Sequence, residues 1–333
     1  MDGVSPLICL DDVTSAAHRI DGRVLRTPTV ASPGLTAHLG VPVTLKLEML
    51  QRTGSFKPRG AFHKLLGLSD AERDAGVVAV SGGNHGLAVS DAAGSLGIAA
   101  TIVMPDSVPE RAVAQCRDSG ATVRLTSTMA GAFALLDELV ADGMTLLHPF
   151  DDRTVLAAQG TVGVELAADA PELTDVLVSI GGGALISGVA TAFRDRDVRI
   201  WGVETEGADA MSRALAQGAP VPFTPTSIVS TLSAPYVTDL TLAHVRELVH
   251  DVLVVSDVDA VRGTLTLAEQ ARIWAEPAAG CLVPAALRVL DRVGPDAHLG
   301  LVICGGNTTV ADVAGWTTRY AAAPFPRRTP PRS

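Results

Sequence analysis

One lysine of this sequence stands among residues that favour covalent chemistry. Lys57 lies in the segment TGSFKPRG (53–60). It follows the small residues Gly54 and Ser55 and the aromatic Phe56. A lysine amine that loses its proton can form a Schiff base with an aldehyde. Small neighbours allow an unusual backbone path and an aromatic ring can cover a planar ligand, so this lysine is a candidate for covalent binding.

Three glycine-rich turns follow short apolar runs that we interpret as strands. They are SGGNHG at Ser81–Gly86, GGGAL at Gly181–Leu185 and CGGN at Cys304–Asn307. Ligands of open parallel sheets bind outside the carboxyl ends of the strands. The amides of a glycine turn that opens a helix favour a phosphate. The lysine and the three turns together predict a covalently held cofactor that carries a phosphate group.

The turn SGGNHG brings three polar side chains next to free backbone amides. Ser81, Asn84 and His85 supply a hydroxyl, an amide and an imidazole, a set that suits a carboxylate. His85 taken alone more often caps a helix. Nucleotide-binding motifs do not fit, because no GxxxxGK[ST] occurs and Ile186 stands where GGGAL would need a third Rossmann glycine.

Length and composition limit the possible classes. The 333 residues suffice for two domains, and 47% hydrophobic with 19% charged residues describes a globular protein. A net charge of −10 disfavours a nucleic-acid partner, which requires a basic surface. No apolar run reaches the roughly 18–20 residues of a membrane span, and the start MDGVSPLICL lacks the features of a signal peptide.

The four cysteines are scattered and form no metal-binding or disulfide pattern. They are Cys9, Cys116, Cys281 and Cys304. No CxxC pair occurs, so we expect a reducing, cytoplasmic setting.

Strand and helix patterns alternate along most of the chain. We expect strands at 77–80, 98–104, 122–125, 176–180, 200–203, 252–255 and 299–303. We expect helices at 87–96, 110–119, 130–141, 155–168, 186–193, 258–274 and 277–290. This alternation predicts an α/β fold with parallel-rich sheets covered by helices.

The motifs in this order resemble those of fold-type II pyridoxal-phosphate (PLP) enzymes, in the serine/threonine dehydratase (ammonia-lyase) and serine racemase branch. They are KLEMLQRTGSFKPRGA (46–61), SGGNHG, HPFDD…AAQGT (148–161), GGGAL, EPAAG (276–280) and CGGN. The similarity extends from about Arg23 to Val310. It implies a two-domain, tryptophan synthase β-like fold. The expected division is a small domain at 47–143, a large one at 1–46 plus 144–318, and a flexible tail at 319–333.

The resemblance also implies a role for each motif. Lys57 would bind pyridoxal 5'-phosphate, Phe56 would lie against its ring, and Asn84 would contact its 3-oxygen. Cys304 would face the pyridine nitrogen, and Glu276 of EPAAG would lie with the cofactor-binding residues. The amides expected at the phosphate are those of Gly181, Gly182, Gly183, Ala184 and Leu185. The residues expected at the substrate carboxylate are Ser81, Gly83, Asn84 and His85.

Two departures from the family pattern bear on the reaction. Serine racemases carry a second serine where Gly82 stands, so a donor for reprotonation from the far face is missing and elimination should dominate. In the optional metal site of the family, Glu204 and Ala208 match but Ala210 replaces an aspartate. We therefore expect no metal there.

The resemblance implies α,β-elimination of L-threonine or L-serine to a 2-oxo acid and ammonia, with Lys57 as general base. Alternatives are a serine racemase-type isomerase, a lyase for another β-substituted amino acid, a β-replacement enzyme and a non-catalytic amino-acid-binding relative. The segment 226–237 is expected to line the side-chain pocket. The only expected partners are the amino-acid substrate and further copies of the chain, as a homodimer or homotetramer.

Overall fold

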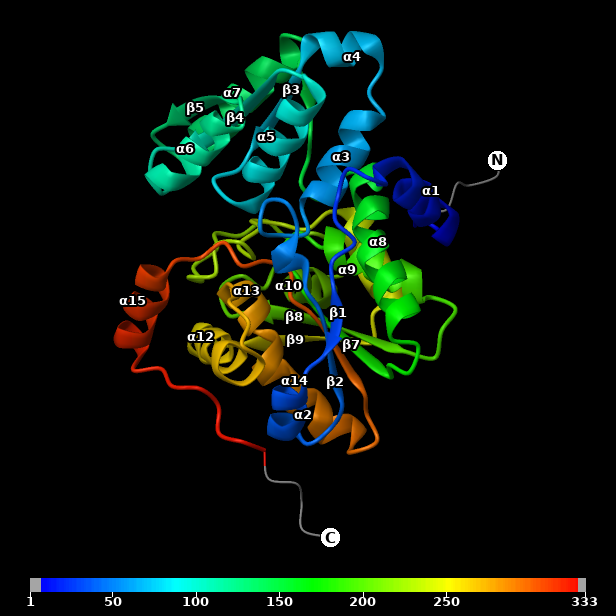
Figure 1. Ribbon diagram of the computed structural model, residues 1–333. Coiled ribbons are helices and arrows are strands. Elements are labelled where there is room, and N and C mark those ends of the chain that lie inside the picture. Colours follow the sequence, from blue (N-terminus) through cyan, green and yellow to red (C-terminus); the bar gives the residue numbers. More distant parts are fainter. Residues whose placement is uncertain (1–6, 329–333) are drawn as a thin grey trace.

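Two sheets form the framework of the protein, as the computed structural model in Figure 1 shows. The structure describes residues 7–328, so part of the amino-terminal stretch tested for a signal peptide lies outside the described residues. The strands are β1 (Thr29–Ala31), β2 (Val43–Lys46), β3 (Val77–Val80), β4 (Ala100–Pro105), β5 (Thr122–Thr126), β6 (Thr145–Leu146), β7 (Asp175–Ser179), β8 (Arg199–Thr205), β9 (Asp251–Val255) and β10 (Leu299–Val302).

The larger sheet has six strands in the order β1-β2-β10-β7-β8-β9. β1 pairs antiparallel with β2, and the remaining neighbours pair in parallel. The smaller sheet has the order β5-β4-β3-β6 and is parallel throughout. The predicted α/β class with parallel-rich sheets is therefore confirmed.

Helices connect and cover these strands. The α-helices are α1 (Leu10–Ile20), α2 (Pro33–Leu39), α3 (Pro58–Leu66), α4 (Asp70–Ala75), α5 (Asn84–Leu96), α6 (Glu110–Asp118), α7 (Met129–Ala141), α8 (Arg153–Asp169), α9 (Ala184–Phe193), α10 (Ala210–Gln217), α11 (Asp239–Leu248), α12 (Asp257–Thr266), α13 (Pro277–Gly280), α14 (Leu282–Val293) and α15 (Val310–Tyr320). A short 3₁₀ turn, η1, spans Glu48–Leu50, and a π-helical turn, η2, spans Leu267–Ala271. Figure 1 shows α8 and α9 on one side of the larger sheet and α12–α14 on the other.

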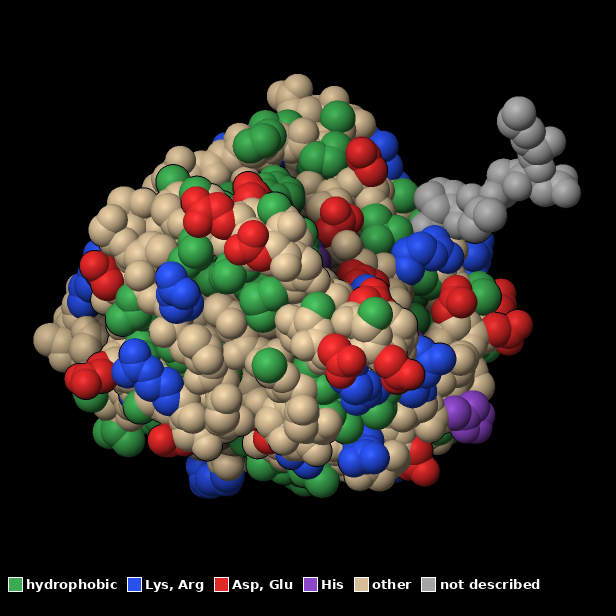
Figure 2. Space-filling view, turned by 90° about the horizontal axis from the view of Figure 1, so that it is seen from above, with side chains coloured by type: hydrophobic (Ala, Val, Ile, Leu, Met, Phe, Trp, Pro, Cys, Tyr) green, Lys and Arg blue, Asp and Glu red, His purple; other side chains and the backbone are tan. Residues whose placement is uncertain are grey.

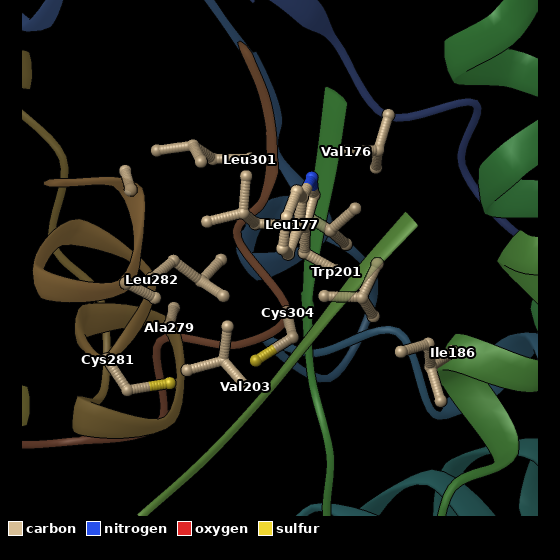
Figure 3. Close-up of a cluster of buried hydrophobic side chains, with 14 of the residues drawn as sticks. Val176, Leu177, Ile186, Trp201, Val203, Ala279, Cys281, Leu282, Leu301 and Cys304 are labelled. Carbon is tan, nitrogen blue, oxygen red and sulfur yellow. The ribbon is translucent and has the colours of Figure 1, made fainter. Parts of the chain in front are cut away.

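The core of the larger lobe lies between its sheet and these helices. Figure 3 shows Leu177 of β7, Trp201 of β8 and Leu301 of β10 packed together near Leu282 of α14. All four side chains are buried. Burial on both faces is what a parallel sheet requires, and it explains why its strands are near-continuous apolar runs in the sequence.

The sequence prediction differs from the structure in several places. The elements before Val77 were not predicted, and neither were α10, α11 and α15. The helix expected at 258–274 ends in η2, since Arg272 adopts a left-handed conformation with φ 61°. The smaller sheet includes β6, so residues 145–146 belong with it and not with the larger domain. The rest of the domain division stays a prediction.

The described part of the carboxyl-terminal tail contacts the larger lobe, and its flexibility stays a prediction. The amide of Phe325 donates to Thr266 Oγ1 at 2.9 Å, and the guanidinium of Arg262 lies 4.0 Å from the Phe325 ring centroid. The amide of Arg328 donates to the carbonyl of His38 at 2.9 Å. The contact between Arg262 and the Phe325 ring and the two hydrogen bonds donated by backbone amides hold this segment on the larger lobe. Residues 329–333 lie outside the described part.

Within residues 7–328, no helix is both long and apolar enough to cross a bilayer. On the face in Figure 2, acidic and basic side chains are interspersed. All four cysteines are free thiols, as predicted. The cytoplasmic location and the homo-oligomeric state stay predictions.

A buried network of charges joins the lysine segment to the larger lobe. Arg59 donates to Glu48 at 2.7 and 2.9 Å and to Glu165 at 2.6 and 2.9 Å. The Nζ of Lys46 donates to Glu165 at 2.6 Å and to the carbonyl of Thr27 at 2.7 Å. Burial opposes ionisation of Glu48, yet the guanidinium of Arg59 holds the pKa of that carboxyl below its usual value. The charges are stable there because each has a partner.

Replacing Arg59 by methionine should strongly destabilise the protein. Arg59→Met leaves two carboxylates without their main partner, a loss that costs about 3–5 kcal/mol for a buried pair. Urea titration of the holoenzyme measures this loss of unfolding free energy. Arg111→Ala is the matched control, because the Arg111–Asp312 pair is well exposed and should contribute at most about 1 kcal/mol. Equal losses of unfolding free energy in the two variants would contradict the stabilising role of the network.

Candidate active site

A cavity of about 620 Å³ is lined by residues from both sheets and from the lysine segment. This volume is typical of small-molecule sites, which span about 300–1,000 Å³. Every residue predicted for the site lines this cavity. They are Phe56, Lys57, Ser81, Gly83, Asn84, His85, Gly181, Gly182, Gly183, Ala184, Leu185, Glu276 and Cys304. Residues 230–236 of the expected side-chain segment line it too.

Contacts with the CGGN turn fix the backbone of the lysine loop. The amide of Phe56 donates to the carbonyl of Cys304 at 3.1 Å, and Ser55 forms an antiparallel bridge with Gly305. Gly54 adopts φ +76°, a conformation that side chains disfavour, and a Cβ there would overlap Asn307. Lys57 then begins α3 and projects into the cavity with its position set by this paired backbone.

The environment of Lys57 makes its amine easier to deprotonate. Burial lowers the pKa of Lys57 to about 8, although Cys304 and Glu276 oppose this shift. Its Nζ has one weak contact, 3.4 Å from the carbonyl of Pro149, and lies 5.0 Å from the Phe56 ring centroid. A buried amine with a lowered pKa can serve as a nucleophile and as a general base.

The GGGAL turn forms a concave backbone surface at the start of α9. Gly183 caps that helix with φ +99°. A Cβ on Gly182 would overlap the ring of Phe150, and one on Gly183 would lie 2.8 Å from Thr241 Cβ. Only glycine fits at these two positions. The amides and the helix terminus together suit an anion.

The SGGNHG turn enters α5 directly. The helix begins at Asn84, three residues before the predicted start, so the amides of Asn84 and His85 belong to its first turn. The Nε2 of His85 lies 2.8 Å from the carbonyl of Leu147. Burial lowers the pKa of His85 to about 3, with Lys57 adding to the shift. His85 is therefore neutral at physiological pH, and an anion at this loop would depend on its backbone donors.

Asn84 lies between two partners. Its Nδ2 donates to Glu276 at 3.0 and 3.3 Å, and its Oδ1 accepts from Asn307 Nδ2 at 2.8 Å. Burial raises the pKa of Glu276 to about 7, although Asn84 and Thr231 donate hydrogen bonds to the carboxyl. The amide of Asn84 is thus held in one orientation, with its nitrogen toward Glu276 and its oxygen toward Asn307.

Cys304 presents a neutral thiol to the cavity. The hydroxyl of Ser179 donates to Cys304 Sγ at 3.3 Å. Burial, together with the nearby carboxyl of Glu276, raises the pKa of Cys304 to about 12. Figure 3 shows Cys304 at the edge of the core beside Val203. A thiol of this kind carries no negative charge and therefore cannot keep an adjacent ring nitrogen protonated.

Glu204, one of the expected metal-site matches, is used within the protein. Its carboxylate accepts from the amides of Met211 and Ser212 at 2.8 and 2.9 Å and from the Ser212 hydroxyl at 2.6 Å. Both oxygens are thus occupied by the first turn of α10.

Sequence reasoning missed several residues that shape the site. Ser179 and Asn307 hold Cys304 and Asn84, and Val108 and Phe150 pack against Gly82 and the phosphate turn. His148 lines the cavity, with Nδ1 accepting from the amide of Asp151 at 2.7 Å. Ser179 precedes GGGAL and Asn307 ends CGGN, so their positions in the motifs were a usable signal.

Comparison with known proteins identifies the family. Residues 20–305 match the family model described as pyridoxal-phosphate dependent enzyme. The chain belongs to this family. The resemblance inferred from the motifs is therefore confirmed, and PLP is the cofactor.

The most similar relatives include ammonia-lyases. The chain is 38% identical over 308 residues to L-threo-3-hydroxyaspartate ammonia-lyase of Pseudomonas sp, covering 91% of this chain and 96% of the relative. It is 38% identical to L-threonine ammonia-lyase of Thermotoga maritima, covering 91% and 77%. The structure of maize serine racemase superposes with a TM-score of 0.86 at 31% identity, covering 94% and 97%. This PLP-dependent enzyme thus falls within the ammonia-lyase and dehydratase group.

The residues of the cavity suit this cofactor. The buried amine of Lys57 can bond to an aldehyde, the glycine turn before α9 lines the cavity with backbone and no side chain, and Cys304 lies in the same cavity. The individual assignments of residues to cofactor or substrate stay predictions.

Incorporation of PLP into the apoprotein should depend on pH through Lys57. Only the neutral amine attacks an aldehyde, and its share rises with pH up to the pKa of about 8. The initial rate of covalent incorporation, followed by absorbance, should increase up to about tenfold per pH unit below that value and level above it. Lys57→Ala should incorporate none. A rate that is constant across this range would contradict the lowered pKa.

Adding a methyl group to the phosphate turn should weaken cofactor binding. In Gly182→Ala the new Cβ overlaps Phe150, an overpacking that costs about 1–3 kcal/mol, or roughly five- to hundredfold in affinity. Titration of the apoprotein with PLP measures the dissociation constant. Gly315→Ala on α15 is the control, since a Cβ there meets nothing within 4 Å. Unchanged affinity in Gly182→Ala would argue against this turn as the phosphate site.

Proposed function

We propose that this enzyme eliminates water from a β-hydroxy amino acid, with L-threonine or L-serine as substrates, and that hydrolysis of the resulting enamine yields a 2-oxo acid and ammonia. The observation that carries the proposal is the meeting of three features in one cavity. They are the buried amine of Lys57, the glycine turn at α9 and the carboxylate-binding turn at α5. The ammonia-lyase relatives support the same class of reaction.

Each part of the cavity has a task in this proposal. The turn at Ser81–Gly86 binds the substrate carboxylate through the first amides of α5. Lys57, as a free amine, takes the proton from the α-carbon. PLP, when bound, takes up the electron pair of the broken bond. The β-hydroxyl gains a proton, which balances the one that Lys57 removed from the α-carbon, and leaves as water. The released enamine product is hydrolysed to the 2-oxo acid and ammonia.

Elimination is favoured over racemisation by the packing at Gly82. A racemase of this type uses a serine hydroxyl at that position as the acid on the far face, as the resemblance implies. Here a Cβ on Gly82 would overlap Cγ1 of Val108, so this backbone leaves no room for a side chain. We therefore give racemisation second place, although serine racemase has a similar fold.

The remaining alternatives have weaker support. His85 stands where β-replacement enzymes carry threonine, by the same resemblance. A non-catalytic binding protein has no use for a buried lysine with a lowered pKa. A lyase for another β-substituted amino acid would use the same groups.

The decisive experiment follows 2-oxo acid formation from L-threonine and L-serine by the purified holoenzyme, with chiral analysis of the remaining amino acid. We expect 2-oxo acid and far less D-isomer. Lys57→Ala should abolish turnover and the absorption band of the lysine-bound cofactor. D-isomer formed faster than 2-oxo acid would replace the proposal with racemisation, and a bound cofactor with no turnover of any β-hydroxy amino acid would overturn the reaction class.

A further inference from the structure

We propose that the preferred substrate carries a large apolar group, aromatic or branched, on its β-carbon, and that Val108, Met129 and Phe133 bind this group. The inference rests on the proposed function and specifies its substrate class. Three observations carry it. They are an apolar wall on α7, apolar lining beside the SGGNHG turn, and the absence of a positive charge among the described lining residues that could pair with a carboxylate substituent.

The apolar wall is one face of α7. Met129, Phe133 and Leu136 follow one another at helical spacing and all line the cavity. Met129 is 47% exposed and Phe133 is 38% exposed, while Leu136 below them is buried in the small core. Large apolar side chains that remain exposed inside a cavity indicate a surface that an apolar ligand covers.

This wall continues to the place where the substrate binds. Val108 also lines the cavity, and its Cγ1 lies against the backbone of Gly82 in the middle of the SGGNHG turn. A substrate whose carboxylate is held by that turn therefore has Val108 beside it. The apolar residues of the smaller lobe thus lie within the substrate end of the cavity.

The charges of the cavity disfavour a second carboxylate. Among the described lining residues there is no arginine, and Lys57 is committed to the cofactor. Burial lowers the pKa of both histidines of the lining, that of His85 to about 3 and that of His148 below its usual value. With Glu276 as the acidic side chain of this lining, a dicarboxylate substrate would bury a charge without a partner. An apolar substituent meets no such penalty.

The test compares kcat/KM of the holoenzyme for L-threo-3-phenylserine, L-threonine and L-threo-3-hydroxyaspartate. One methylene in an apolar pocket is worth about 10- to 200-fold. We therefore expect phenylserine to exceed threonine by at least about tenfold, and hydroxyaspartate to be the poorest of the three. A kcat/KM for threonine or hydroxyaspartate equal to or above that for phenylserine would overturn the inference.

The variant Phe133→Ala tests the contribution of the apolar face of α7 to substrate preference. This variant should lower the phenylserine-to-threonine ratio of kcat/KM about tenfold. Val140→Ala is the matched control, because Val140 lies on the same helix, is 39% exposed and is not among the cavity-lining residues. Its ratio should equal that of the unchanged protein. Equal effects of the two variants, or none from Phe133→Ala, would contradict the role of α7.

The outcomes separate this inference from the proposed function. Turnover of threonine without preference for phenylserine retains the ammonia-lyase proposal and removes the inference. A holoenzyme that forms 2-oxo acid from none of the three substrates, and none from L-serine, removes both.

Discussion

The pairing of Arg59 with Glu48 and Glu165 is the constraint on which the active site depends. Arg59 follows Lys57 by two residues, and Glu48 precedes the lysine loop. The guanidinium therefore ties both ends of this loop to each other and to α8. Three charged side chains with little or no exposure are tolerated only while they remain paired, so the network has one arrangement. The direction of Lys57 into the cavity is fixed by this arrangement and by the bridge to Gly305.

Burial of the site also determines its chemistry. Burial lowers the pKa of Lys57 and raises the pKa values of Glu276 and Cys304, because each group is more stable uncharged there. A reactive amine and a neutral thiol thus arise from one physical cause. Ser179 and Asn84 keep the partners of the cofactor in place through hydrogen bonds and add no charge to the cavity.

The two lobes contribute different properties. The larger sheet supplies the glycine turn and Cys304 to the cavity, and Figure 1 shows this lobe below the smaller one. The smaller sheet supplies the SGGNHG turn and the apolar face of α7. Substrate preference can therefore change through Val108, Met129 and Phe133 while the groups that perform the chemistry stay as they are.

The sequence by itself determined the fold class and the cofactor, and it named residues that the structure brings together in one cavity. Strand and helix periodicities are local properties of the chain. Lys57, Asn84 and Gly181–Leu185 stand in short motifs that can be recognised from the order of the residues alone. Only the tertiary structure decided which distant residues meet. Four features depend on contacts between separate segments or on burial. They are the packing of Val108 against Gly82, the hydrogen bond from Ser179 to Cys304, the capping of α10 by Glu204 and the apolar wall of α7. Desolvation likewise sets the pKa of Lys57, and burial is a property of the folded molecule that no local pattern encodes.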